Sequence, residues 1–162
     1  MNNFSKIIIL VDENTHEHCL SHFLSNTHFD SSPDIIEIPQ GEVNKTIETC
    51  LEVWRSLSEL SADRKSLLIN LGGGVVTDLG GFVASTFKRG IKFINIPTSL
   101  LAMVDSSIGG KTGINSKYGK NLIGSFYFTN GNWIATFIHD EHAQSRNEEH
   151  QHHRCDRNGR HY

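Results

Sequence analysis

Short apolar runs alternate with helix-like segments from residue 6 to residue 128, and this alternation restricts the chain to few folds. The apolar runs cover residues 6–11, 34–38, 66–71 and 92–96. Strands as short and apolar as the first of these are typical of a sheet that is buried on both faces. Repeated strand–helix units at this spacing indicate a parallel sheet covered by helices. We therefore predict an α/β fold with an open, mainly parallel sheet and helices on both of its faces.

A helical segment is predicted after each apolar run. Asn44 is a favourable N-cap residue for the second of these helices. Ile47, Leu51, Trp54 and Leu57 then recur at helical spacing, which predicts that they form its buried face. The other helices are predicted at residues 12–26, 75–86 and 98–104.

Composition narrows the class of protein. Of the 162 residues, 37% are hydrophobic and 20% charged, as in an ordinary globular domain. A formal charge of −3 provides no basic field for nucleic acid, and no apolar run approaches the roughly 18 residues that cross a bilayer. Residues 1–6 do not have the pattern of a signal peptide, and three widely spaced cysteines favour reduced thiols. We expect a cytoplasmic protein that binds neither nucleic acid nor membranes.

The most informative local pattern is the glycine turn Gly72-Gly73-Gly74, between a predicted strand and a predicted helix. Glycines at this point let backbone amides approach a phosphate closely, and the helix N-terminus adds partial positive charge. The turn departs from the standard dinucleotide fingerprint, because Thr77 stands where the third glycine is expected. A phosphate site and a tight turn that serves packing alone both remain open on these residues.

A second glycine-rich stretch covers residues 105–124. Its Gly-Lys-Thr at residues 110–112 suggests a nucleotide triphosphate loop, but that motif requires glycine where Asp105 stands, so we reject it. The stretch still predicts a polar, cationic loop that could hold an anionic ligand, through Asp105, Lys111, Lys117, Lys120 and Asn121. A solvated surface loop is the alternative interpretation.

A third candidate is the segment Gln40–Lys45, which connects a predicted strand to a predicted helix. Open α/β sheets bind ligands at such connections, and the Glu42 carboxylate could accept hydrogen bonds from ribose hydroxyls there. Charged residues in the first turn of a helix equally often face water, so this segment by itself is a weak indication.

Together these stretches resemble 3-dehydroquinate synthase. The resemblance covers residues 6–128 and is most specific from Leu71 onward. It is carried by Gly41-Glu42-x-x-Lys45, GGGVVTDLGGF at 72–82, Arg89-Gly90, IPTSLLAMVDSSIGGKTGIN at 96–115 and GKNLIGSFY at 119–127. Related sugar-phosphate cyclases share the fold but generally differ in the segment 105–113, and glycerol dehydrogenase-like enzymes share the glycine turn but lack that segment.

The resemblance implies that residues 1–128 form a Rossmann-like domain that binds NAD. Enzymes of this family are homodimers that also use a divalent metal, zinc or cobalt. They are phosphate-eliminating lyases of the shikimate route to aromatic amino acids, and they convert 3-deoxy-D-arabino-heptulosonate 7-phosphate to 3-dehydroquinate and phosphate. NAD briefly oxidises one carbinol, which acidifies the neighbouring C–H so that phosphate can leave.

The resemblance also implies roles for single residues. At the adenosine end of NAD it places Glu42 and Lys45, with Asp12 as a companion. Around the pyrophosphate and the adjoining ribose it places Gly74, Val75, Val76 and Asp78. Thr98 and Ser99 are further cofactor contacts, and Lys111 and Lys120 are placed between cofactor and substrate. The implied catalytic and substrate contacts are Asp105, Lys111 and Asn121, together with Arg89, which matches an arginine that reaches the partner subunit's site.

The chain also departs from the family, whose members are much longer. Their metal ligands, one Glu and two His, come from a mostly helical second domain that we expect to be missing here. Residues 129–162 show no resemblance and hold few apolar residues, so we expect a disordered tail. Its histidines have spacings that could bind zinc, but nothing apolar would fix the ligands, and we expect no metal site in this chain.

We therefore expect an NAD-binding fragment that is inactive alone. Three alternatives stay open: a non-catalytic NAD-binding module, a fragment of a related sugar-phosphate cyclase, and a subunit completed by a separately encoded second domain.

Overall fold

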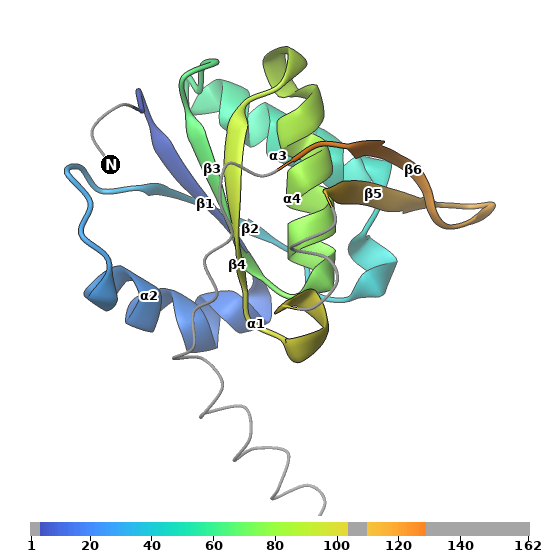
Figure 1. The fold of residues 1–162 in the computed structure, drawn as a ribbon, viewed down its shortest axis with the longest axis horizontal. Coiled ribbons are helices and arrows are strands. Elements are labelled where there is room, and N and C mark those ends of the chain that lie inside the picture. The colour runs from blue at the N-terminus through green and yellow to red at the C-terminus, as the bar shows by residue number, and fades with distance from the viewer. Residues whose placement is uncertain (1–3, 104–109, 129–162) are drawn as a thin grey trace, which may run out of the picture.

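Four parallel strands form the centre of the computed structural model, which describes residues 4–103 and 110–128 (Figure 1). The strand order is β2-β1-β3-β4, and every neighbouring pair is parallel. The strands are β1 (Ile7–Asp12), β2 (Asp34–Ile38), β3 (Leu67–Gly72) and β4 (Lys92–Pro97). Each apolar run that predicted a strand forms one, and the predicted parallel sheet is confirmed.

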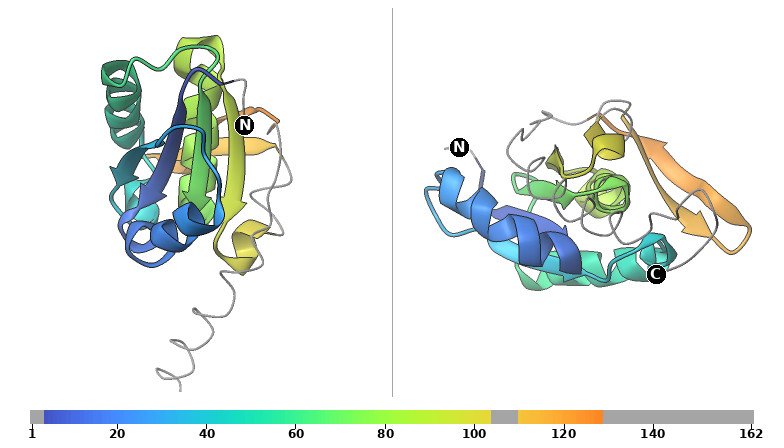
Figure 2. Two further views of the ribbon diagram at one scale, coloured as in Figure 1. Left: turned by 90° about the vertical axis from the view of Figure 1, so that its left-hand side faces the viewer. Right: turned by 90° about the horizontal axis from the view of Figure 1, so that it is seen from below.

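Helices cover both faces of this sheet (Figure 2). One face carries a continuous helical segment made of α1 (Glu13–Thr15), the π-helical η1 (His16–Leu20) and α2 (Ser21–Asn26). The other face carries α3 (Ile47–Glu59) and α4 (Gly74–Thr86). Successive side chains of β1 point to opposite faces of the sheet. Ile8 and Leu10 therefore pack in the hydrophobic cluster with α3 and α4, and Ile9 packs in the cluster with η1.

The connection from β2 to α3 corrects one prediction. Residues Glu42–Asn44 form a short 3-10 helix, η2, and α3 begins only after it. The N-cap residue of α3 is Thr46, whose hydroxyl accepts a hydrogen bond from the Thr49 N–H (3.4 Å). Asn44 is therefore not the N-cap residue, and its side chain instead donates to the Gln40 carbonyl (2.7 Å).

The buried face of α3 is also rotated from the predicted one. Cys50, Val53 and Leu57 are buried, whereas Leu51 is 54% exposed. Trp54 packs at the margin of the cluster, where its ring lies 6.3 Å from that of Phe82. Packing against the sheet and α4 decides which side of the helix is buried, and a cysteine serves there as a small apolar residue.

Residues 110–128 form a β-hairpin and not the loop that their glycines predict. Strands β5 (Lys111–Ser116) and β6 (Gly119–Phe126) pair antiparallel and pack on α4 beside the main sheet (Figure 1). Gly113 and Gly124 face each other in the ladder, and a Cβ on Gly113 would lie only 3.0 Å from the Ile123 carbonyl oxygen. These glycines permit close packing of the two strands, so they do not mark a flexible loop.

Tyr127, which directly follows β6, fixes the base of the hairpin to the domain. Its ring stacks on Phe93 of β4, with centroids 5.8 Å apart, and its hydroxyl donates to the Ile91 carbonyl (3.3 Å). The lysines and the asparagine of the glycine-rich stretch are therefore held by a paired sheet that rests on the core.

Candidate functional site

The candidate site lies at the carboxyl edge of the sheet, where the chain leaves β1 and β3. The chain passes from β1 outward to β2 and then returns across β1 to β3, so the crossover direction reverses between β1 and β3. Ligands of open α/β sheets bind at such a reversal. Asp12 ends β1 and Gly72 ends β3, and the Thr98 N–H donates to the Gly72 carbonyl (3.1 Å). The segments that follow β1, β3 and β4, each with predicted cofactor contacts, thus lie at the same edge of the sheet.

The glycine turn brings bare backbone to the start of α4. Gly73 is the N-cap residue of this helix, and no side chain of the described residues caps it. A Cβ on Gly73 would lie 3.5 Å from Ser99 Oγ, so a side chain here would project toward the segment that follows β4. Backbone N–H groups at a helix start and the helix dipole together attract an anion.

Packing behind the turn explains why Gly72 carries no side chain. Its Cβ would lie 2.6 Å from the Cβ of Val76, which is fully buried. Val76 therefore faces the core, and it can contribute to a ligand site only through its backbone. Gly74 and Val75 are half-buried at the first turn of α4.

Lys45 is the charged side chain that the fold buries at this edge. It is 3% exposed, and its Nζ donates to Asp78 Oδ2 (2.5 Å) and to Asn121 Oδ1 (2.7 Å). A buried ammonium is costly unless it is paired and hydrogen-bonded, and these two partners meet that requirement. The structure thus brings together three residues, predicted separately as site residues, from the η2–α3 connection, α4 and β6.

Asn115 is a residue of this edge that had no predicted role. Its side chain donates to the Glu42 carboxylate (2.8 Å) and accepts from the Asn121 N–H (2.9 Å), while its own N–H donates to the Lys45 carbonyl (2.8 Å). The residue closes the 96–115 segment on which the family resemblance rests, but its polar character alone gave no indication of these bonds.

The other predicted cofactor contacts lie around this group. Asp12 is the N-cap residue of α1, where its Oδ1 accepts from the Thr15 N–H and hydroxyl, both at 2.8 Å. Lys111 and Lys120 are exposed on the hairpin. Thr98 and Ser99 are half-buried after β4. Asp105 lies outside the described residues.

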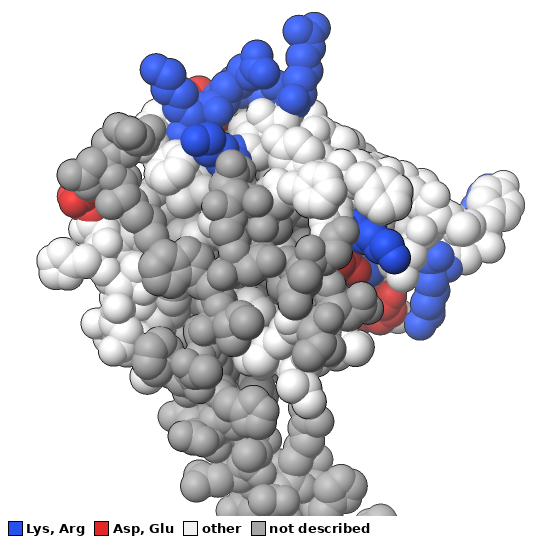
Figure 3. Space-filling view, in the orientation of Figure 1, with Lys and Arg blue, Asp and Glu red and all other residues white. Residues whose placement is uncertain are grey.

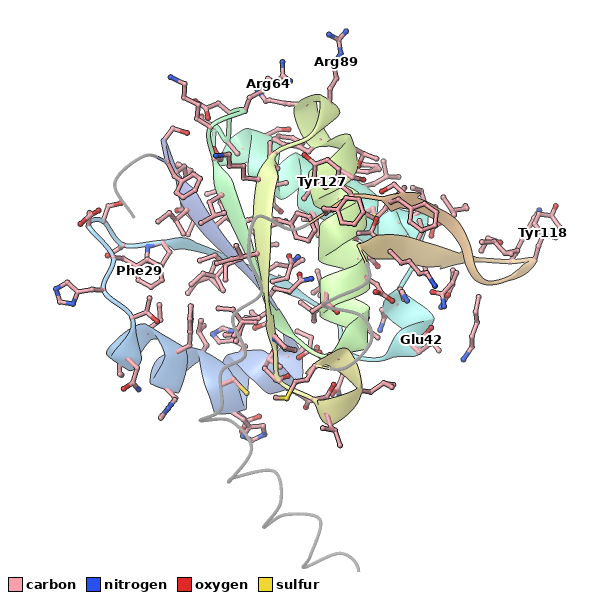
Figure 4. All side chains as sticks on the ribbon, viewed as in Figure 1. Phe29, Glu42, Arg64, Arg89, Tyr118 and Tyr127 are labelled. Atoms are coloured by element: carbon pink, nitrogen blue, oxygen red, sulfur yellow. The ribbon has the colours of Figure 1, made fainter. Side chains whose placement is uncertain are left out.

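Arg89 lies at the opposite edge of the sheet. It belongs to η3 (Phe87–Arg89), which follows the C-terminus of α4, and its φ of 68° is in the left-handed region. Figure 4 shows Arg89 and Arg64 pointing away from the domain, at the far end of α4 from Glu42. Lysines and arginines gather over this end (Figure 3). Arg89 is therefore not part of the group formed by Glu42, Lys45 and Asn121.

The described residues contain neither a membrane-spanning helix nor a metal-binding cluster. Within 4–103 and 110–128, no helix is long and apolar enough to cross a membrane. The same residues contain no group of three or more His, Cys, Asp or Glu side chains arranged to hold a metal ion. The histidine-rich stretch of the tail falls outside these ranges.

The fold defines a Rossmann-like α/β domain, and the candidate site lies at the carboxyl ends of its strands. The model of the 3-dehydroquinate synthase N-terminal family matches residues 35–146, which continues past residue 128. A 3-dehydroquinate synthase of Parabacteroides distasonis is 48% identical over 124 residues, which make up 76% of this chain and 35% of that enzyme. The chain belongs to the 3-dehydroquinate synthase family, and it spans about a third of the length of that relative.

Solved structures agree with this assignment. A 2-deoxy-scyllo-inosose synthase complexed with carbaglucose-6-phosphate, NAD+ and Co2+ has a TM-score of 0.70 and 27% identity, over 80% of this chain and 36% of that one. The 2-epi-5-epi-valiolone synthase of Streptomyces hygroscopicus, with NAD+ and Zn2+ bound, has a TM-score of 0.70 and 29% identity, over 80% of this chain and 37% of that one. Both are similar to this chain over the described α/β domain.

Proposed function

We propose that this chain binds NAD at the carboxyl edge of its sheet, as the cofactor-binding part of a 3-dehydroquinate synthase. The observation that carries the proposal is the bare backbone of Gly72–Gly74 at the uncapped start of α4. The pyrophosphate of a dinucleotide is an anion that such amides can hold without interference from a side chain. The NAD+ in two solved relatives supports the choice of ligand.

The residues around the turn have the chemistry that the rest of NAD requires. Gly74, Val75 and Val76 would offer backbone N–H groups to the pyrophosphate, with Asp78 beside them. Glu42 and Lys45 would hold the adenosine end, with Asp12 at the end of the neighbouring strand. Thr98, Ser99, Lys111 and Lys120 would contact the cofactor from the segments after β4 and from the hairpin.

In the complete enzyme, the substrate would be 3-deoxy-D-arabino-heptulosonate 7-phosphate and the products 3-dehydroquinate and phosphate. Bound NAD supplies a hydride acceptor for one carbinol of the substrate. This chain would contribute Asp105, Lys111 and Asn121 toward the substrate, and Arg89 toward the site of a partner subunit. The exposed place of Arg89 at the far edge supports that last role.

We further propose that cofactor binding and metal binding belong to different domains of the complete enzyme. Residues 1–128 would form the NAD-binding domain, residues 129–162 a tail outside it, and the zinc or cobalt ligands would lie in a second domain. The chain alone would bind cofactor without turnover. Cys50, a buried free thiol, suits the reducing cytoplasm in which such a lyase would act.

Calorimetric titration with NAD tests the binding step. The unaltered chain should bind NAD, and Gly73→Ala should bind it at least about tenfold more weakly, because the added methyl projects into the proposed phosphate site. The 3.5 Å contact with Ser99 Oγ is an ordinary one, so this variant should keep its melting temperature. Equal affinity of the two proteins would place NAD elsewhere.

An activity assay with zinc and the sugar phosphate tests whether the chain alone lacks turnover. Binding of NAD without turnover supports a cofactor-binding fragment, whereas turnover by this chain without any partner would refute it. Absence of NAD binding by a folded chain would reject the proposal altogether.

A further inference from the structure

The hairpin departs from regular pairing at one point, next to the candidate site. Ile114 pairs with Ile123 and Ser116 pairs with Gly119, so the single residue Asn115 of β5 stands opposite residues 120–122 of β6. A β-bulge leaves extra residues of one strand, here β6, outside the ladder, and bulges are frequent beside active sites. Asn115, which lies opposite this bulge, uses its backbone N–H outside the hairpin, on the Lys45 carbonyl (2.8 Å).

Strand β6, opposite Asn115, has an unusual backbone conformation at Asn121. Asn121 of β6 has a φ of 53°, a left-handed conformation that asparagine adopts more readily than most other residues with a side chain. Its N–H donates to Asn115 Oδ1 (2.9 Å), so the Asn115 side chain replaces a carbonyl of the ladder. The Asn121 side chain then accepts from Lys45 Nζ (2.7 Å), which closes the group.

The amide of Asn115 suits this place better than any other side chain of its size. Its Nδ2 faces two acceptors of Glu42, the carboxylate Oε1 (2.8 Å) and the carbonyl oxygen (3.2 Å), and its Oδ1 faces a donor. Only this orientation of the amide satisfies all the bonds. Aspartate would keep the acceptor but would place a carboxylate against that of Glu42, and leucine would lose every bond of the side chain.

We propose that Asn115 is a positioning residue, which fixes the Glu42 carboxylate toward the ribose hydroxyls of a bound dinucleotide and at the same time holds Asn121 in place. The inference rests on the proposed function, in which the Glu42 carboxylate binds the ribose of NAD. Asn115 itself acts through Glu42 and need not touch the ligand. A carboxylate held in one orientation before binding loses less freedom when the ligand arrives, and that raises affinity.

A double-mutant cycle on residues 42 and 115 tests the inference, with NAD affinity measured by calorimetry and the melting temperature measured on the same samples. Asn115→Asp should weaken NAD binding at least about tenfold. Glu42→Gln should also weaken it, because the carboxylate is lost. In the double variant Glu42→Gln/Asn115→Asp, the new amide at position 42 can donate to the new carboxylate at position 115, which restores the hydrogen bond with its polarity reversed.

The double variant decides between positioning and a merely structural role. We expect it to bind NAD within about twofold of Glu42→Gln alone, since Asn115 acts through residue 42, and to recover the melting temperature lost by Asn115→Asp. Asn26→Asp, the same chemical change on α2 at the other face of the sheet, should leave NAD affinity unchanged.

Two results would overturn the inference. Asn115→Asp could bind NAD as tightly as the unaltered chain, or the losses of the two single variants could simply add in the double variant. If Asn115→Asp does not fold, the double variant still decides, because its affinity relative to Glu42→Gln can be measured. If the unaltered chain does not bind NAD, both the proposed function and this inference are wrong. If the unaltered chain binds NAD and Asn115→Asp does not change the affinity, only the inference is wrong.

Discussion

Single residues show how strictly the interior of this domain controls polar groups. Asn70 of β3 and Asn95 of β4 are both buried, and the Asn70 amide donates to Asn95 Oδ1 (2.9 Å). Asn70 Oδ1 has no hydrogen-bond partner among the described residues, and it points at the backbone of Gly80, where a side chain would collide with it. Gly80 is thus explained by packing, although it lies within the segment that carries the family resemblance.

Cys50 gives a prediction at the scale of a single titrating group. Burial in the core raises the pKa of its thiol from 9.0 to about 12, and the nearby Glu48 charge adds to the rise. Between these two values the folded chain keeps a proton that the unfolded chain releases, so the thiol contributes stability that is full below pH 9.0 and is lost as the pH rises toward 12. The loss should reach about 1.4 kcal/mol per pH unit within this window.

Urea unfolding at pH 8, 9, 10 and 11 measures this effect in the unaltered chain and in Cys50→Ala. The unaltered chain should lose stability more steeply with pH than the variant, whose residue 50 does not titrate. Parallel pH dependences for the two proteins would show that the thiol is not responsible.

Elements of secondary structure were predictable where one strong pattern determined them. The four strands of the sheet and the helix after the glycine turn follow from apolar runs and from the turn itself, and both are confirmed. The N-cap residue of α3 was missed, because η2 takes Asn44 and delays the helix to Ile47. The hairpin was missed because its glycines, typical of loops, serve close packing between strands and against α4.

The contacts within the candidate site could not be predicted from local sequence patterns. The family resemblance placed Glu42, Lys45 and Asn121 near a ligand, but the bond between Lys45 and Asn121 joins residues 76 positions apart in the chain. No local pattern encodes contacts of this kind. They arise only when the hairpin packs on α4 and reaches the η2 segment.

Packing between α4 and the hairpin can be tested at Gly81. A Cβ at this position would lie 2.5 Å from Thr112 Cγ2, so Gly81→Ala should force the hairpin away from the helix and destabilise the chain by about 1–3 kcal/mol. Thr112→Ser removes that methyl group and keeps the hydroxyl, which contacts Ser125 Oγ at 2.7 Å. The double variant Gly81→Ala/Thr112→Ser should therefore regain part of the lost stability in urea unfolding. An unrelieved loss in the double variant would contradict close packing at this point.

Residues 4–103 and 110–128 form a domain with surfaces of different chemical character. The carboxyl edge of the sheet holds the candidate site, and the opposite edge gathers exposed cations, among them Arg64, Lys65, Lys88 and Arg89 (Figure 3). The third surface is the hairpin, which projects beside α4 (Figure 1) and exposes Leu122, Phe126 and Phe128 by 63%, 77% and 75%. Large apolar side chains exposed on one element are a candidate surface for association.

This apolar surface of the hairpin predicts the behaviour of the chain in solution. We expect concentration-dependent self-association, because joining two such surfaces removes apolar area from water at about 25 cal/mol per Å². Leu122→Thr/Phe126→Thr keeps residues that favour strands and should raise the dissociation constant by about tenfold or more in sedimentation velocity. Leu51→Thr provides the control, since Leu51 is an apolar side chain that is exposed by 54% and belongs to α3, not to the hairpin. Self-association that is unchanged by the hairpin substitutions, or reduced equally by Leu51→Thr, would show that the hairpin is not the surface through which the chains associate.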